Sequence, residues 1–149
     1  MTIFDRVLKR DRDNGQIVLS TPEAYAAVAV AAIAADGNVT DDEANRTALN
    51  LATVAVFRRY ELREMGDVLN RVALLIQRRG PAAVLKAAKE TLSSAQAESA
   101  FFLAADLTLA DGSFGSDERE FLEQLKNSLM VNDSTALKIV EVVVIKNRT

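Results

Sequence analysis

A short acidic pattern occurs twice in this chain, and it constrains the fold more than any other feature. Residues 34–43 can be aligned without gaps with residues 109–118. Both segments contain Ala-Asp-Gly followed by Asp-Glu, with an apolar residue, Val39 or Phe114, between the two groups. Each segment follows an Ala-rich apolar stretch and precedes a stretch with helical periodicity. The sequence therefore predicts a helix, an acidic turn and a second helix, occurring twice.

Helical patterns also extend over most of the remaining chain. Only two prolines interrupt the 149 residues, and aromatic residues make up 5% of them, so the composition favours helices. We predict a single all-α domain, residues 1–149, built as a pseudo-twofold bundle of about seven or eight helices. The repeat halves cover about residues 22–57 and 95–130, and a basic helical middle covers residues 58–92. The two Ala-rich helices should pack closely inside.

Capping and breaking signals predict where the helices begin and end. Thr21 is the expected N-cap of the first Ala-rich helix, and Thr40 with Glu43 forms a capping box for the helix after it. Asp133 is the expected cap of the last helix. The β-branched run Ile139–Ile145 would also suit a strand, but no second strand is available to pair with it, so we expect helix. The expected helical segments are about 1–10, 21–35, 40–57, 61–79, 81–92, 95–110, 116–129 and 134–147.

Two missing residue types limit the chemistry of the chain. It contains neither cysteine nor histidine, which excludes disulfides, thiolate and imidazole metal sites, and catalysis by either side chain. A bound metal would be held by oxygen atoms, the ligands of hard cations such as Ca²⁺, Mg²⁺ or Mn²⁺. Because no serine stands out as a nucleophile either, we expect no enzymatic activity. A metal-assisted hydrolase is the weaker alternative.

Hydropathy predicts where the protein is located. The longest uncharged apolar run, residues 24–35, is shorter than the roughly 20 residues that a membrane-spanning helix needs. The opening segment, MTIFDRVLKRDRD, lacks the apolar stretch of a signal peptide. We therefore expect a cytoplasmic protein.

Charge is unevenly distributed along the chain. Residues 21–55 carry a net charge of −4 and residues 93–133 a net charge of −6, whereas residues 56–92 carry +4. The basic middle segment could dock an acidic protein or an anionic membrane surface, with Arg58, Arg59, Arg78 and Arg79 as its main residues. Nucleic acid is a weaker candidate, because aromatic residues are rare in this segment and the overall pI is about 5.1.

The acidic turns allow two interpretations. In the first, they are only helix ends: glycine ends one helix, a hydroxyl residue caps the next, and the following acids are favoured by the helix dipole. This interpretation leaves Asp36 and Asp111 unexplained, because the dipole disfavours a carboxylate at the C-terminal end of a helix by about 0.3–1 kcal/mol. In the second interpretation, a bound cation offsets that cost.

The spacing within each turn supports a cation site. Asp-Gly, an apolar residue two positions later and Glu four positions after that reproduce the second half of an EF-hand loop. The ligands of the first half are missing, because apolar residues occupy their positions. We therefore expect weak binding, with water completing the coordination of the cation.

Three sequence features resemble the tellurite-resistance TerB family, and the resemblance covers essentially the whole chain. They are the two [AL]-A-D-G turns followed by D-E, the opening MTIFDRVLKR and the closing SLMVNDSTALKIVE. The resemblance implies an all-helical pseudo-twofold fold in a cytoplasmic bacterial protein of tellurite and stress resistance. It also implies membrane and calcium-binding protein partners of the same system, and hence a peripheral position at the inner membrane through such a partner.

The resemblance further implies metal binding through the acidic turns. Gly115 departs from the family pattern, in which a polar residue follows the apolar one, so the second turn should have one ligand fewer. The implied metal-binding residues are Asp36, Asp42, Glu43, Asp111, Asp117 and Glu118. Without a cation, the chain would instead be a helical adaptor whose acidic turns are only helix caps and whose basic middle segment binds the partner.

Overall fold

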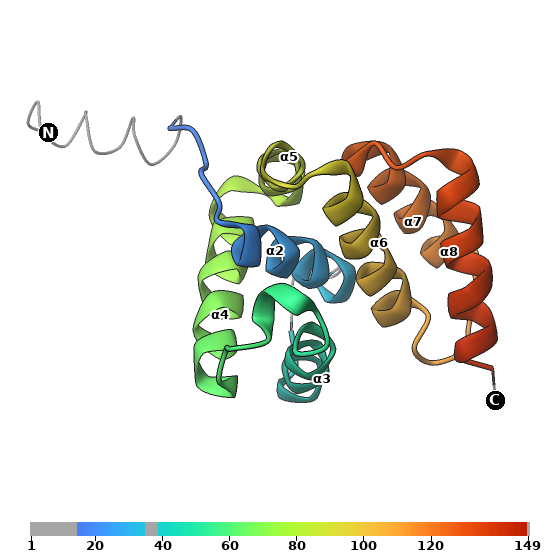
Figure 1. Ribbon diagram of the computed structural model, residues 1–149, viewed down its shortest axis with the longest axis horizontal. Coiled ribbons are helices and arrows are strands. Elements are labelled where there is room, and N and C mark those ends of the chain that lie inside the picture. The colour runs from blue at the N-terminus through green and yellow to red at the C-terminus, as the bar shows by residue number, and fades with distance from the viewer. Residues whose placement is uncertain (1–14, 35–38, 149) are drawn as a thin grey trace, which may run out of the picture.

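The protein is helical throughout the part of the chain that the structure describes. The computed structural model describes residues 15–34 and 39–148, which contain seven α-helices, one 3₁₀-helix and no strand (Figure 1). The predicted all-α class is confirmed, including the helical state of Ile139–Ile145. The predicted helix over residues 1–10 lies outside the described residues. The elements are α2 (Thr21–Ile33), α3 (Asp41–Leu51), η1 (Ala55–Phe57), α4 (Leu62–Arg79), α5 (Pro81–Thr91), α6 (Ser94–Thr108), α7 (Ser116–Leu129) and α8 (Asp133–Lys146).

Helix α2 forms the centre of the molecule. Every residue from Glu23 to Ala31 is buried, and α2 packs against α4, α5 and α6 (Figure 1). Its five buried alanines have short side chains, which lets the neighbouring helices approach closely. The predicted contact between the two Ala-rich helices, α2 and α6, is present.

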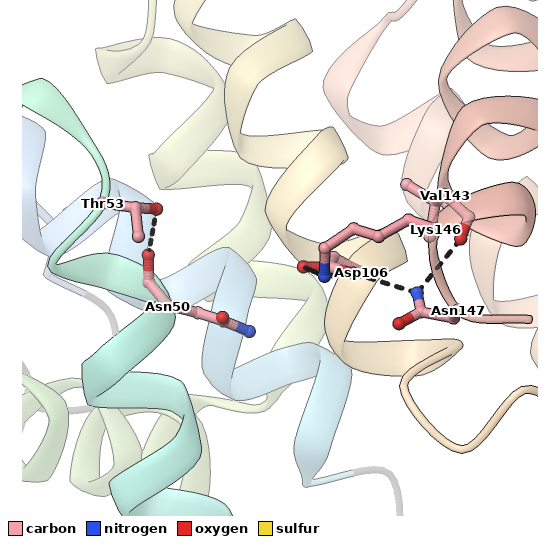
Figure 2. Close-up of polar contacts among 6 residues, drawn as sticks. All are labelled: Asn50, Thr53, Asp106, Val143, Lys146 and Asn147. Atoms are coloured by element: carbon pink, nitrogen blue, oxygen red, sulfur yellow. Dashed lines mark hydrogen bonds and ion pairs between the residues drawn. The ribbon is translucent and has the colours of Figure 1, made fainter. Parts of the chain in front are cut away.

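Two buried carboxylates connect helices across the core. Glu23 of α2 forms an ion pair with Arg71 of α4, with 3.0 Å between the charged atoms. Asp106 of α6 accepts hydrogen bonds from Lys146 at 2.9 Å and from Asn147 at 3.0 Å (Figure 2). The second group fixes the C-terminal end of α8 to α6.

The predicted helix caps need two corrections. Ser20, not Thr21, is the N-cap of α2, because its hydroxyl accepts a hydrogen bond from the Glu23 backbone while the Glu23 carboxylate accepts one from Ser20 N. Asn132, not Asp133, caps α8, since its side-chain oxygen accepts a hydrogen bond from Ser134 N. In both cases the cap lies one residue before the predicted position.

The helix after the first acidic turn is shorter than predicted. Helix α3 ends at Leu51 and not near Phe57, and the Thr53 hydroxyl donates a hydrogen bond to the Asn50 backbone oxygen just beyond this end (Figure 2). The chain then turns through η1, which buries Phe57 to 1% exposure against Tyr60. Burial of this aromatic ring favours the turn over continued helix.

Hydropathy of the described helices agrees with the sequence. Within residues 15–34 and 39–148, no helix combines the length and the apolar character needed to cross a membrane.

Candidate functional site

The first acidic turn is described only from Val39 onward. Asp36, with Gly37, lies outside the described residues. Thr40 and Glu43 form the predicted capping box: Thr40 Oγ1 accepts from Glu43 N at 3.1 Å, and the Glu43 carboxylate accepts from Thr40 N at 3.2 Å. Asp42 is exposed and has no hydrogen bond or ion pair with the described residues. Capping therefore accounts for Glu43 through hydrogen bonds, and for Asp42 only through the helix dipole at the first turn of α3.

The second acidic turn is built differently. Gly112 has a φ of 82°, as expected for the glycine that ends a helical stretch. Asp111 lies beyond the end of α6, and its Oδ1 accepts a hydrogen bond from Ser113 N at 2.9 Å. This Asx turn gives Asp111 a structural role that the sequence did not predict. The helix dipole therefore disfavours the Asp111 carboxylate less than the sequence suggested, because Asp111 is not within the last turn of α6.

Glu118 occupies the same position in α7 that Glu43 occupies in α3, but it does not close a capping box. The N-cap of α7 is Gly115, which has no side chain to donate or accept. The Glu118 carboxylate instead accepts a hydrogen bond from the Ser113 hydroxyl at 3.1 Å. A Cβ atom at Gly115 would lie 3.0 Å from Glu118 Oε2, so glycine leaves room for this carboxylate.

Carboxylates of both acidic turns line one hollow between α2, α3, α6 and α7. Glu43 comes from the first turn, and Asp117 and Glu118 come from the second. The hollow has a volume of about 260 Å³. Asp42 and Asp111 do not line it. Three of the six predicted site residues are therefore brought to one place.

The remaining lining residues follow the same internal alignment as the acids. Ala32 corresponds to Leu107, Ile33 to Thr108, Glu43 to Glu118 and Arg46 to Phe121 in the sequence, and all eight line the hollow. The alignment thus pairs residues beyond the acidic turns themselves. Sequence reasoning missed Arg46, Thr108 and Phe121, because the alignment pairs Arg46 with Phe121 and Ile33 with Thr108, and the members of each pair are chemically unlike.

The electrostatics of the hollow are mixed. Arg46 brings a positive charge beside the three carboxylates. The hydroxyl of Thr108 is buried and has no hydrogen-bond partner within the described residues. Over residues 15–34 and 39–148, no three acidic side chains lie close enough together to hold a metal ion.

The predicted basic residues lie in two pairs. Arg58 and Arg59 are exposed just after η1, before α4 begins, whereas Arg78 and Arg79 are the last two residues of α4. An 18-residue helix is about 27 Å long, so the pairs lie at opposite ends of α4. Arg79 also donates a hydrogen bond to the Gly15 backbone oxygen at 2.8 Å. A partner would have to contact the two pairs over an extended surface.

Comparison of the chain with protein-family models, with curated proteins and with solved structures gave no match.

Proposed function

We propose that this protein is a cation-binding interaction module of a cytoplasmic tellurite- or stress-resistance system. A hard divalent cation binds weakly at the two acidic turns, and the cation-loaded protein docks a protein partner. One observation carries the proposal: carboxylates from two turns that are distant in the sequence line a single hollow. No residue is assigned a catalytic role.

Helix capping is the competing explanation for the acids, and it accounts for the two turns unequally. It explains Glu43, which closes a capping box, but not Glu118, which is at the equivalent position and bonds to Ser113 instead. For Asp117 it offers only the helix dipole, because this side chain is in the first turn of α7 and has no hydrogen bond or ion pair with the described residues. A cation held near Asp117 would offset the repulsion between this side chain and the neighbouring Glu118 carboxylate.

The affinity of the proposed site should be low. Few protein oxygens are available, since Glu43 and Glu118 already accept hydrogen bonds. The guanidinium of Arg46 lines the same hollow and repels a divalent ion. We therefore expect most of the coordination sphere to be water, with Mg²⁺, Ca²⁺ and Mn²⁺ as the cations to test.

Thermal unfolding of the wild type and of the double variant Asp117→Asn/Glu118→Gln, which neutralises two of the three carboxylates that line the hollow, tests the cation site. With a chelator present, the variant should be slightly less stable than the wild type, because it loses two negative charges that the helix dipole favours in the first turn of α7. Added cation should stabilise the wild type by about 2.7 kcal/mol at a hundredfold excess over Kd. The double variant should lose most of this gain. An unchanged melting temperature of the wild type in millimolar Ca²⁺, Mg²⁺ and Mn²⁺ would refute the cation site.

Charge reversal of the basic pairs tests the docking part of the proposal. Arg58→Glu/Arg59→Glu should weaken capture of an acidic partner, and more strongly at low salt than at high salt. Lys138→Glu/Arg148→Glu, at two exposed cations outside the basic middle segment, is the control, because it changes the net charge by the same amount. Equal effects of the paired reversal and of the control would argue against a defined basic docking surface.

A further inference from the structure

A second hollow lies away from the acidic pocket, between α7 and α8. Both helices pack against α6, on the C-terminal side of the molecule, but they make few contacts with each other (Figure 1). The groove between them has a volume of about 520 Å³, within the range of small-molecule sites. Its apolar lining consists of Phe101, Phe114, Leu122, Ala136, Leu137 and Val140.

Part of this lining is exposed, although the residues are large and apolar. Leu137 is 60% exposed and Phe114 is 37% exposed, whereas Phe101 at the base is buried. An aliphatic chain lying in the groove would cover both exposed side chains and remove its own apolar surface from water. The groove therefore favours an elongated apolar ligand.

The charged groups along the groove differ in how they are paired. The Lys126 ammonium is held between Asp133 and Glu123, and these hydrogen bonds raise the pKa of Lys126 above its ordinary value of 10.5. Arg119 instead lies with its guanidinium carbon 5.1 Å from the centre of the Phe114 ring. Its side chain has no carboxylate partner among the described residues. Of the two cations, only Arg119 can accept a new anion without giving up an ion pair.

We propose that the groove between α7 and α8 binds a free amphiphile with a linear apolar chain and a single carboxylate. The carboxylate pairs with the Arg119 guanidinium, which can offer two parallel N–H donors to it. The apolar chain covers Phe114 and Leu137. A single unpaired arginine matches a ligand with one negative charge. This site shares no residue with the acidic pocket, so it does not depend on the proposed cation binding.

Isothermal titration with straight-chain carboxylates below their micelle concentrations tests the proposal. Dodecanoate should bind at one saturable site, and affinity should fall about fourfold for each methylene removed towards octanoate. Dodecanol, with no negative charge, should bind about tenfold or more weakly, because it cannot form the charge-assisted pair with Arg119. Non-saturable uptake at many sites, or equal binding of dodecanol and dodecanoate, would overturn the proposal.

Matched variants locate the binding. Leu137→Ser should weaken dodecanoate binding several-fold, whereas Ile145→Ser, also on α8 and also 60% exposed but outside the groove, should not. Arg119→Gln should remove the preference for dodecanoate over dodecanol, and Arg63→Gln should leave it unchanged. Equal effects within either pair would refute the site. Binding of a peptide with an apolar C-terminus, but not of dodecanoate, would refute the free amphiphile in favour of a protein ligand.

Discussion

Glu43 and Glu118 allow capping to be separated from other roles of the acids, because they occupy equivalent positions. Each is the third residue of its helix, so substitution by alanine changes the dipole interaction and the helix propensity by similar amounts in both cases. The difference between the two substitutions therefore isolates the hydrogen bonds of the cap. Only Glu43 bonds to both the backbone nitrogen and the hydroxyl of its N-cap residue, Thr40.

The expected magnitude follows from these bonds. Glu43→Ala removes the two bonds from Thr40 to the Glu43 carboxylate but keeps the N-cap bond from the residue 43 backbone nitrogen to Thr40 Oγ1. A hydrogen bond contributes about 0.5–1.5 kcal/mol net, and the Glu118 bond to the exposed Ser113 hydroxyl contributes less. With a chelator present, Glu43→Ala should therefore lower the free energy of unfolding by about 1 kcal/mol more than Glu118→Ala. For a chain of this length, that difference corresponds to about 2–4 °C in melting temperature.

Urea unfolding followed by circular dichroism measures the difference, with midpoints compared at a constant m-value. Thr40→Ala is the control, since it removes the other half of the same cap. The double variant Thr40→Ala/Glu43→Ala should be less destabilised than the sum of the two single variants, because both disrupt one set of bonds. An equal loss of stability for Glu43→Ala and Glu118→Ala would refute the distinction between the two turns.

Four further substitutions test two groups of ion pairs and one backbone position outside the acidic hollow. Lys146→Met should lower the free energy of unfolding in urea by about 2 kcal/mol, because it leaves the Asp106 carboxylate, 10% exposed, with Asn147 as its remaining partner. Asp106→Leu should lower it less, since the Lys146 side chain is 56% exposed and stays hydrated. The reverse order of the two losses would contradict this reasoning. Because the pKa of Lys126 is raised, its ion pairs stabilise the folded state below pH 10.5 and are lost as the pH rises through the raised value. In that alkaline range, the melting temperature of Lys126→Met should therefore fall less steeply with pH than the melting temperature of the wild type does. Gly80→Ala should lower stability by about 1–3 kcal/mol through backbone strain alone, because the φ of 84° disfavours a side chain that would otherwise meet no neighbour; an unchanged urea midpoint would rule this out.

Local signals predicted most of the fold. Thr40 with Glu43, and Gly80 with Pro81, fix helix ends through bonds or breaks between near neighbours in the chain, so they can be read from the sequence. The end of α3 was missed because it depends on the burial of Phe57, a tertiary contact. The caps of α2 and α8 were placed one residue late, because several polar residues there could have served as caps.

The repeat predicted three of the residues that line the hollow, but not their arrangement. The repeat identified Glu43, Asp117 and Glu118, but no local pattern shows that two turns so distant in the sequence share one hollow. Arg46 was not singled out in the sequence, although it lines the same hollow as these acids. The Asx turn of Asp111 was missed because it requires the conformation of the turn and not only its composition.

An NMR titration of the amide-labelled protein with Ca²⁺, Mg²⁺ and Mn²⁺ tests the cation site most directly. The account predicts saturable shifts, or paramagnetic broadening with Mn²⁺, confined to amides near residues 36–43 and 111–118. Both turns should respond at the same cation concentration, because their carboxylates line one hollow. Absence of any response at millimolar cation would contradict the account, as would shifts spread over unrelated acids such as Glu61, Asp67 and Glu90.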